Sequence, residues 1–149
     1  MRKCFLALAA VVALAGCAAQ EPLLRKTASG LPEATFYQTS LDDARSKLIG
    51  TCASSGILVQ DSGPNHVTCG KEMEGPGAAF IQMAIGNSYS STPVRVVRFT
   101  IFPQGADVRV VANKWAESQM PTGKVNKMDL DSNVERNATQ QFLVRAGAR

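Results

Sequence analysis

Apolar and polar side chains alternate in two neighbouring segments, residues 94–102 and 107–113, and this pattern constrains the fold more than any other feature of the sequence. A period of two is typical of a strand with one buried face. The turn-forming stretch Pro-Gln-Gly-Ala separates the two segments, so we expect them to form an antiparallel hairpin. Pairing Ile101 with Val108 gathers the apolar side chains on one face.

The opposite face of this hairpin is predicted to carry Arg98 and Arg109. A slip of one residue in the pairing would bury both arginines, so the pattern strongly favours one apolar face and one charged face. We expect the charged face to be solvated or to contact a partner. Arg98 and Arg109 are therefore candidate contact residues.

A helix is expected before the hairpin. Ser40 is a good N-cap residue, and Asp42 and Asp43 would lie in the first turn, where the helix dipole favours negative charge. Apolar residues recur at steps of three and four along one stripe: Leu41, Ala44, Leu48 and Cys52. The helix is expected to end near residues 54–56, with its stripe facing the core.

Cys52 and Cys69 are expected to form a disulfide. Residues 57–71 hold two short apolar runs around the turn-rich stretch Asp-Ser-Gly-Pro-Asn, which predicts a second hairpin with Ile57 opposite Cys69. Cys69 then points toward the helix, and closing a loop of this length would contribute on the order of 3 kcal/mol. Metal ligation is the alternative, but two thiols and His66 do not make a set of zinc ligands.

Two further segments complete the predicted domain. Residues 78–86 fit either a helix or a strand, and we favour a strand because alternate positions are apolar. Near the C-terminus, Ser132 and Glu135 match a capping box, and Gly147 is a reasonable C-cap. The helix between them would bury a stripe made of Val134, Ala138, Phe142 and Leu143.

These elements predict an α+β domain. An antiparallel sheet of four to five strands, with an N-terminal and a C-terminal helix packed on one face, buries all the apolar stripes. This order is similar to the helix-grip arrangement, which occurs in a lipoprotein of the outer-membrane β-barrel assembly machinery. The resemblance is one of predicted topology and location, and it implies no functional residues.

The N-terminus has the features of an export signal. Arg2 and Lys3 precede an apolar run that is shorter than the roughly 20 residues a membrane-spanning helix needs, which favours a signal peptide. The stretch Leu14-Ala15-Gly16-Cys17 resembles the lipobox of bacterial lipoproteins, in which the cysteine is joined to diacylglycerol and becomes the acylated first residue. The resemblance implies a signal peptide over residues 1–16 and a lipid anchor on Cys17. An ordinary signal peptide in which Cys17 is incidental is the alternative.

The mature chain is expected to contain a tether and one domain. Residues 17–33 comprise the lipidated cysteine and a flexible tether, and residues 34–149 form a single periplasmic domain. Ala18 follows the cysteine, where Asp would favour inner-membrane retention, so the resemblance implies an outer-membrane location. The protein would face the periplasm unless it is exported to the cell surface.

The sequence offers little that would support catalysis. His66 is the sole histidine, and neither a nucleophile elbow nor a phosphate-binding loop is present. We expect His66 to be a solvated residue at the end of a turn. The acidic pairs Asp42-Asp43 and Asp129-Asp131 could serve glycan hydrolysis, but helix starts explain both better. We therefore expect a non-enzymatic protein without a cofactor or a metal.

Nucleic acid is not an expected partner. The whole chain has a net charge of +4, and removal of Arg2 and Lys3 with the signal peptide lowers it to about +2. The sequence has no Lys/Arg run and no basic motif interleaved with aromatic residues.

A contact surface is predicted around the single tryptophan. Residues 114–128 are long for a connecting loop, and long loops are often functional. The candidate contact residues there are Trp115, Met120, Lys124 and Lys127, with Tyr89 in a second loop. The alternative is that Trp115 closes the core at a strand end.

The expected function is an accessory or adaptor role in an envelope protein assembly, exercised from a membrane anchor. A small-ligand or lipid binder is the alternative, and a spacer without a specific partner is a third possibility. A carrier needs an apolar cavity, whereas an adaptor should have a fully packed core and a surface that binds other proteins. The sequence alone does not distinguish the two, because the same apolar residues can line a cavity or fill a core.

Overall fold

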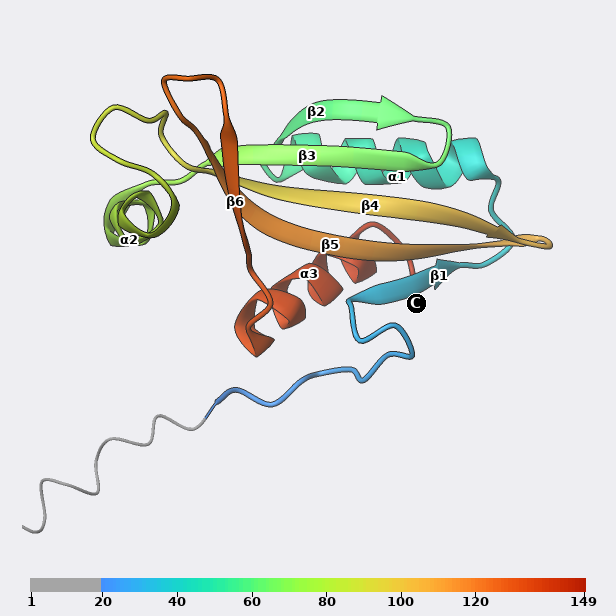
Figure 1. The fold of residues 1–149 in the computed structure, drawn as a ribbon. Coiled ribbons are helices and arrows are strands. Elements are labelled where there is room, and N and C mark those ends of the chain that lie inside the picture. The colour runs from blue at the N-terminus through green and yellow to red at the C-terminus, as the bar shows by residue number, and fades with distance from the viewer. Residues whose placement is uncertain (1–19) are drawn as a thin grey trace, which may run out of the picture.

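The computed structural model describes residues 20–149 (Figure 1). The expected signal peptide, the lipobox and Cys17 lie outside the described residues.

Six antiparallel strands form one sheet, in the order β1-β5-β4-β3-β2, with β6 also paired to β5. The strands are β1 (Glu33–Phe36), β2 (Leu58–Gly63), β3 (His66–Glu72), β4 (Val94–Gln104), β5 (Asp107–Gln119) and β6 (Val125–Asp129). Because β5 is 13 residues long, one of its edges pairs with β1 along its first half and with β6 along its second half.

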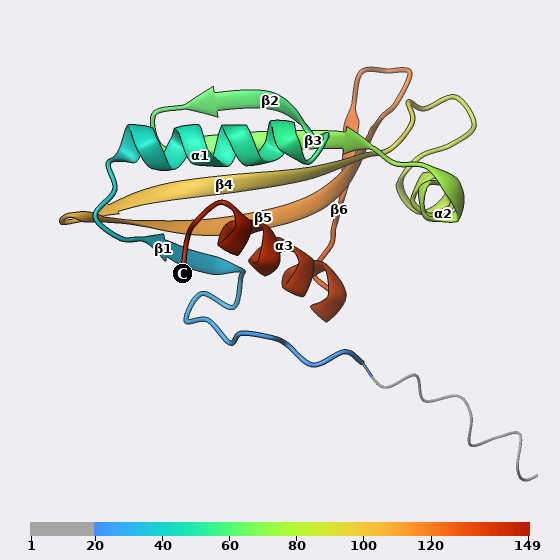
Figure 2. The same ribbon diagram turned by 180° about the vertical axis from the view of Figure 1, so that it is seen from behind.

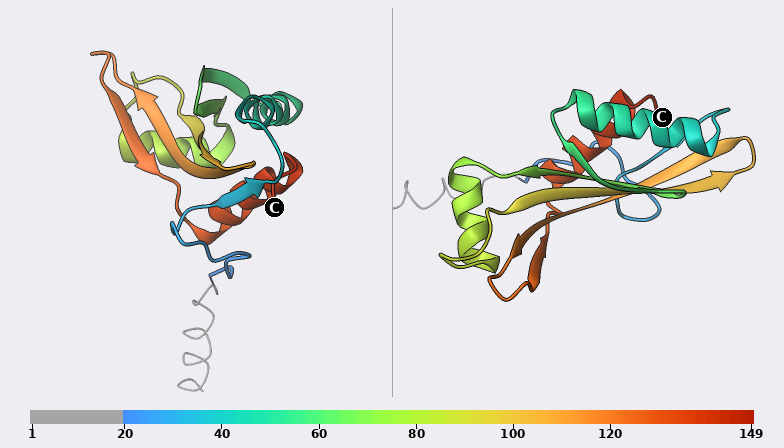
Figure 3. Two further views of the ribbon diagram at one scale, coloured as in Figure 1. Left: turned by 90° about the vertical axis from the view of Figure 1, so that its right-hand side faces the viewer. Right: turned by 90° about the horizontal axis from the view of Figure 1, so that it is seen from above.

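Three helices accompany the sheet: α1 (Leu41–Ser54), α2 (Gly75–Ile85) and α3 (Asn133–Arg145). α1 and α3 lie next to each other against one face, as Figure 2 shows from behind. α2 lies at the far end of the sheet, with its axis across the strands (Figure 3). The expected α+β class is thus confirmed, with more strands and one more helix than expected.

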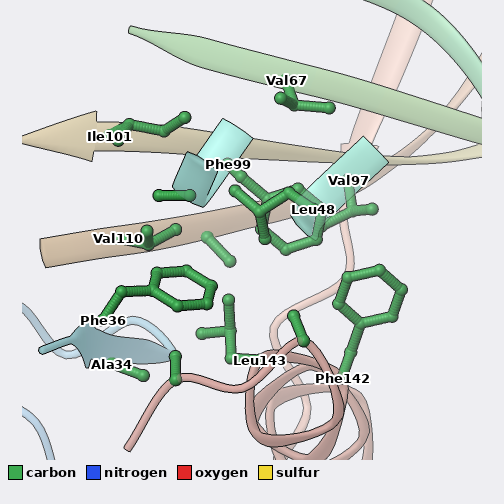
Figure 4. Close-up of a cluster of buried hydrophobic side chains, with 14 of the residues drawn as sticks. Ala34, Phe36, Leu48, Val67, Val97, Phe99, Ile101, Val110, Phe142 and Leu143 are labelled. Carbon is green, nitrogen blue, oxygen red and sulfur yellow. The ribbon is translucent and has the colours of Figure 1, made fainter. Parts of the chain in front are cut away.

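The main core lies between the sheet and the pair α1 and α3 (Figure 4). Phe36, Leu48, Phe99 and Leu143 are almost completely buried in it. α1 forms as the sequence predicts: the Ser40 side chain accepts a hydrogen bond from the backbone of the first turn, and the expected stripe faces the core.

The disulfide between Cys52 and Cys69 is present, and both residues are fully buried. The expected partner of Cys69 across the hairpin is wrong, because Val59 lies opposite it in place of Ile57. An irregularity at Gln60 shifts the register between β2 and β3.

The β4–β5 hairpin keeps the predicted faces but has a different register. Ile101 pairs with Val110 rather than with Val108. The cause is a tighter turn than expected: Gln104 already pairs with Asp107, so two residues form the loop in place of four. A shift of two residues leaves every side chain on its predicted face.

The segment expected to be a strand at residues 78–86 is helix α2. Ala78, Ile81 and Ile85 are spaced by three and four residues, and they form a second, smaller core with Ala116 and Met128. Pro76 lies in the first turn, where proline suits a helix start. The alternating pattern was therefore compatible with both structures, and packing selected the helix.

Residues 114–128 are not an unstructured loop. They form the end of β5, the turn at residues 120–124 and most of β6. Tertiary pairing thus extends the alternating pattern of β5 beyond Asn113, where the strand was expected to end.

The apolar stripe expected on α3 is only half correct. Phe142 and Leu143 are buried, but Val134 is exposed. Asn137 and Gln140 are buried because their amides bind the N-terminal part of the chain.

The segment expected to be a flexible tether is partly docked on α3. The backbone N–H of Leu24 donates to Asn137 Oδ1 at 2.8 Å, and Asn137 Nδ2 donates to the Pro22 carbonyl at 2.9 Å. Asn133 Nδ2 also donates to the Glu21 carbonyl at 2.7 Å. Glu33, the last residue of the expected tether, is the first residue of β1.

Candidate functional site

The contact residues predicted on strands lie on the sheet face that the helices leave uncovered. Arg98, Arg109 and Trp115 alternate in β4 and β5 with residues of the main core, and Lys127 lies beside Trp115. The predicted charged face is therefore present. Trp115 does not close the main core.

Most of the predicted contact residues on this uncovered face are bound to other side chains of the same chain. Trp115 Nε1 donates to Glu117 Oε2 at 2.7 Å, and Lys127 Nζ lies 4.8 Å from the centroid of the indole ring. Arg109 forms an ion pair with Glu33. Burial raises the pKa of Glu33, but hydrogen bonds from Arg109 and Ser29 outweigh it and hold this pKa below its ordinary value.

Arg98 shares this face, and the remaining predicted contact residues lie elsewhere on the surface. Arg98 is exposed on the uncovered face and has no carboxylate partner within the described residues. Met120 and Lys124 lie at the tip of the β5–β6 hairpin. Tyr89 is 85% exposed in the loop between α2 and β4. These residues do not converge on one pocket.

His66 is not free in solvent, contrary to expectation. Its Nε2 lies 2.8 Å from Asp61 Oδ2, and its side chain is mostly buried. The hydrogen bond with His66 is the main reason that the pKa of Asp61 lies below its ordinary value. Because Nδ1 contacts Asn65 at 3.4 Å, both ring nitrogens have polar neighbours within the hairpin. These contacts explain His66 as a structural residue.

The strongest candidate site is a cleft that the sequence did not reveal. An open cleft of about 390 Å³ lies on the helix-covered face of the sheet. Residues of β3, β4 and β5 form its floor, α3 forms one wall, and the start of α2 forms the other. Its volume falls within the range of small-molecule sites, roughly 300 to 1,000 Å³.

Three basic residues cross the floor of the cleft in a diagonal row. Lys71 of β3 lies directly opposite Arg95 of β4 in the strand pairing, and Lys114 of β5 lies opposite Val97, two residues further along β4. Like charges directly opposite each other destabilise a sheet. The row therefore costs stability, which is typical of a binding site.

Carboxylates offset only part of this positive charge. Glu135 of α3 binds Lys114 Nζ at 2.5 Å and lies 3.5 Å from a guanidinium nitrogen of Arg95. Glu72 and Glu74 also border the cleft. Within the described residues, Lys71 has no ion-pair partner.

The α3 wall combines an aromatic surface with a fourth cation. The Phe142 ring stacks on Phe99 with the centroids 5.1 Å apart, and it lies at the margin of the main core (Figure 4). The guanidinium carbon of Arg145 is 5.9 Å from the centroid of Phe142. The cleft thus presents cations beside an apolar surface that also includes Val97 and Met73.

The sequence held a signal for this site. Lys71 and Arg95 continue the inward-facing alternation of their strands, at positions where an apolar residue would extend the core. A charged residue at such an inward-facing position indicates either the edge of the covered core or a binding site. The convergence of five elements, three strands and two helices, could not be predicted from local patterns.

No protein-family model, no curated protein and no solved structure matches the chain. Within residues 20–149, no helix has the length and apolar character needed to span a membrane. The same residues contain no group of three or more His, Cys, Asp or Glu side chains arranged to hold a metal ion.

Proposed function

We propose that the protein is a membrane-anchored envelope lipoprotein whose domain binds an amphipathic anion without catalysing a reaction. The anchor is supported by the resemblance of residues 14–17 to a lipobox, which makes Cys17 the acylated first residue. Ala18 supports an outer-membrane location, with the domain facing the periplasm.

The observation that carries the binding role is the row formed by Lys71, Arg95 and Lys114 beside the Phe142 wall. A bound carboxylate or phosphate would relieve the repulsion within this row. Hydrogen bonds to charged groups contribute about 1.5 to 3 kcal/mol each. An apolar chain on the same ligand would bury the exposed part of the aromatic wall.

The shape of the site favours an amphipathic ligand over a fully enclosed hydrocarbon. Leu48, Val67 and Phe99 fill the main core, and the cleft opens to the surface. A fatty carboxylate or an alkyl phosphate would place its charged end among the cations and leave part of its chain accessible.

An adaptor role is the second candidate, and the uncovered sheet face favours it. Trp115 is half-buried there, and Arg98 is exposed without an ion-pair partner within the described residues. Aromatic residues and arginine are enriched in protein interfaces. An envelope protein that recognises this face would contact the predicted residues that lie on it, such as Arg98 and Trp115.

Ligand titration tests the binding role. The Cys17→Ser protein is titrated with dodecanoate and, as a neutral ligand with the same chain, dodecyl maltoside, below their micelle concentrations. Arg95→Gln should weaken dodecanoate binding on the order of tenfold, because a charge-assisted contact is lost. Arg98→Gln is the matched control, since it changes the same strand on the opposite face.

The outcomes separate the two candidates. Equal affinity for the neutral ligand, or equal effects of the two arginine variants, would exclude the anion site. Crosslinking in intact cells addresses the adaptor: an envelope protein that is lost with Trp115→Ala and Arg98→Gln, but retained with Arg95→Gln, would place the contact on the uncovered face.

A further inference from the structure

Helix α2 has an exposed face that nothing in the described chain covers. It contains no charged residue, and Gln82 is its one strongly polar side chain. A helix that is apolar all round is normally buried, yet Phe80 is 62% exposed and Met83 is 78% exposed. Because Ala78, Ile81 and Ile85 pack against the sheet, Phe80 and Met83 lie on the outward side of the helix.

This exposed face lies at one end of the molecule together with other interfacial residues. The loop that follows α2 exposes Tyr89, and the tip of the β5–β6 hairpin carries Lys124. α2 and this hairpin lie at the end opposite the β4–β5 turn in Figures 1 and 2, and the first described segment, coloured blue, begins on the same side. Tyrosine and lysine are typical of surfaces that contact lipid headgroups.

The chain between the expected anchor and the domain is short. Glu21 is held by two side chains of α3, Asn133 and Asn137, and Pro22 and Leu24 are bound there as well. Three residues therefore lie between Cys17 and the first docked residue, Glu21, and the four Cα-to-Cα steps reach at most roughly 14 Å when fully extended. A free tether over residues 18–33 would reach about four times as far.

We propose that α2 rests on the bilayer, with Phe80 and Met83 inserted among the lipid headgroups and upper acyl chains. This inference rests on the proposed acylation of Cys17. Only a short segment joins the expected anchor on Cys17 to the domain, and this segment meets the domain toward the end that carries α2. A bilayer is thus the surface that the anchored chain brings within reach of the exposed face. Interfacial helices bury their apolar face about 5 to 10 Å into the boundary between headgroups and acyl chains.

Photolabelling from within the lipid phase tests this orientation. The acylated full-length protein is reconstituted into phosphatidylethanolamine and phosphatidylglycerol vesicles that contain a phospholipid with a diazirine on its acyl chain. After illumination, trypsin releases residues 72–95 as one peptide, because cleavage follows Lys71 and Arg95. This peptide contains all of α2 and Tyr89.

The expected result is lipid adducts on residues 72–95 that are largely lost in Phe80→Ser/Met83→Ser. Val144→Ser is the matched control, because Val144 is 57% exposed near the C-terminal end of α3 and away from the α2 end. All three substituted side chains are exposed, so the fold should persist. An intact disulfide between Cys52 and Cys69, both inside the tryptic peptide of residues 48–71, verifies it.

Two results would overturn the inference. Label confined to the N-terminal peptide would mean that α2 stands clear of the bilayer. Absence of α2 label in pure lipid, combined with α2 crosslinks to a protein in native membranes, would assign this face to a protein partner. The mass of the N-terminal peptide reports acylation of Cys17 separately, so failure of the proposed anchor is distinguished from failure of α2 docking.

Discussion

Removal of the disulfide between Cys52 and Cys69 should lower the free energy of unfolding by about 3 kcal/mol. The bond joins α1 to β3 across a sequence separation of 17 residues. In the chain-entropy model, opening a loop of this size returns on the order of 10 cal/mol/K to the unfolded chain, which is about 3 kcal/mol at 25 °C. Because both side chains are fully buried, replacing them with alanine adds a smaller packing cost.

Urea unfolding of the Cys17→Ser protein measures this effect. The fluorescence of Trp115, the single tryptophan, reports loss of the sheet. With slopes of about 1 to 3 kcal/mol per molar urea, the midpoint of Cys52→Ala/Cys69→Ala should fall by about 1 to 3 M. The control is the protein that keeps both cysteines, reduced after unfolding and refolded under reducing conditions. Its midpoint should be similar to that of Cys52→Ala/Cys69→Ala. Equal midpoints for the oxidised and reduced proteins would refute the loop-entropy argument.

Two further substitutions test packing and electrostatics. Leu48→Ala removes a fully buried side chain from the main core and should cost about 2 to 5 kcal/mol in urea unfolding; a loss below about 1 kcal/mol would mean that the core collapses around the gap. Gly63→Ala places a Cβ against the imidazole ring of His66, so the ring should move and its hydrogen bond to Asp61 should break. The pKa of Asp61 should then rise toward its ordinary value in an NMR titration. In the native protein, the bond stabilises the fold above the ordinary carboxyl pKa and is lost as the pH falls through the lowered pKa. An unchanged titration in the variant would show that His66 does not set this pKa.

Local chemistry explains why α1 could be predicted so well. The Ser40 cap, the acidic first turn and the spacing of Leu48 and Cys52 all act within a few residues of one another. Burial of this stripe then placed Cys52 against the sheet. Because Cys69 was also expected to face inward on its own strand, the disulfide could be predicted, and it is present in the structure.

Strand register depended on details that composition does not specify. A two-residue loop between Gln104 and Asp107 in place of a four-residue loop moved every pair of the hairpin by two. The irregularity at Gln60 had a comparable effect in the first hairpin. Both changes preserve the faces, because side chains alternate with a period of two.

The identity of α2 required tertiary information. Ala79, Ile81, Met83 and Ile85 alternate as in a strand, but Ile81 and Ile85 are also neighbours on a helix. The second core, which includes Met73 and Ala116, selected the helix. The segment fits two periods because it is apolar on nearly every side, and the same property leaves Phe80 and Met83 exposed once one side has packed.

The position of the cationic row follows from a mismatch in element lengths. α1 has 14 residues and spans about 21 Å, whereas β5 has 13 residues and extends over about 44 Å. A helix alongside the strands therefore covers only about half of their length. The main core occupies that half, and α2 covers the far end. Lys71, Arg95 and Lys114 lie on the stretch between them, where α3 forms only a side wall and the inward-facing positions can carry charge.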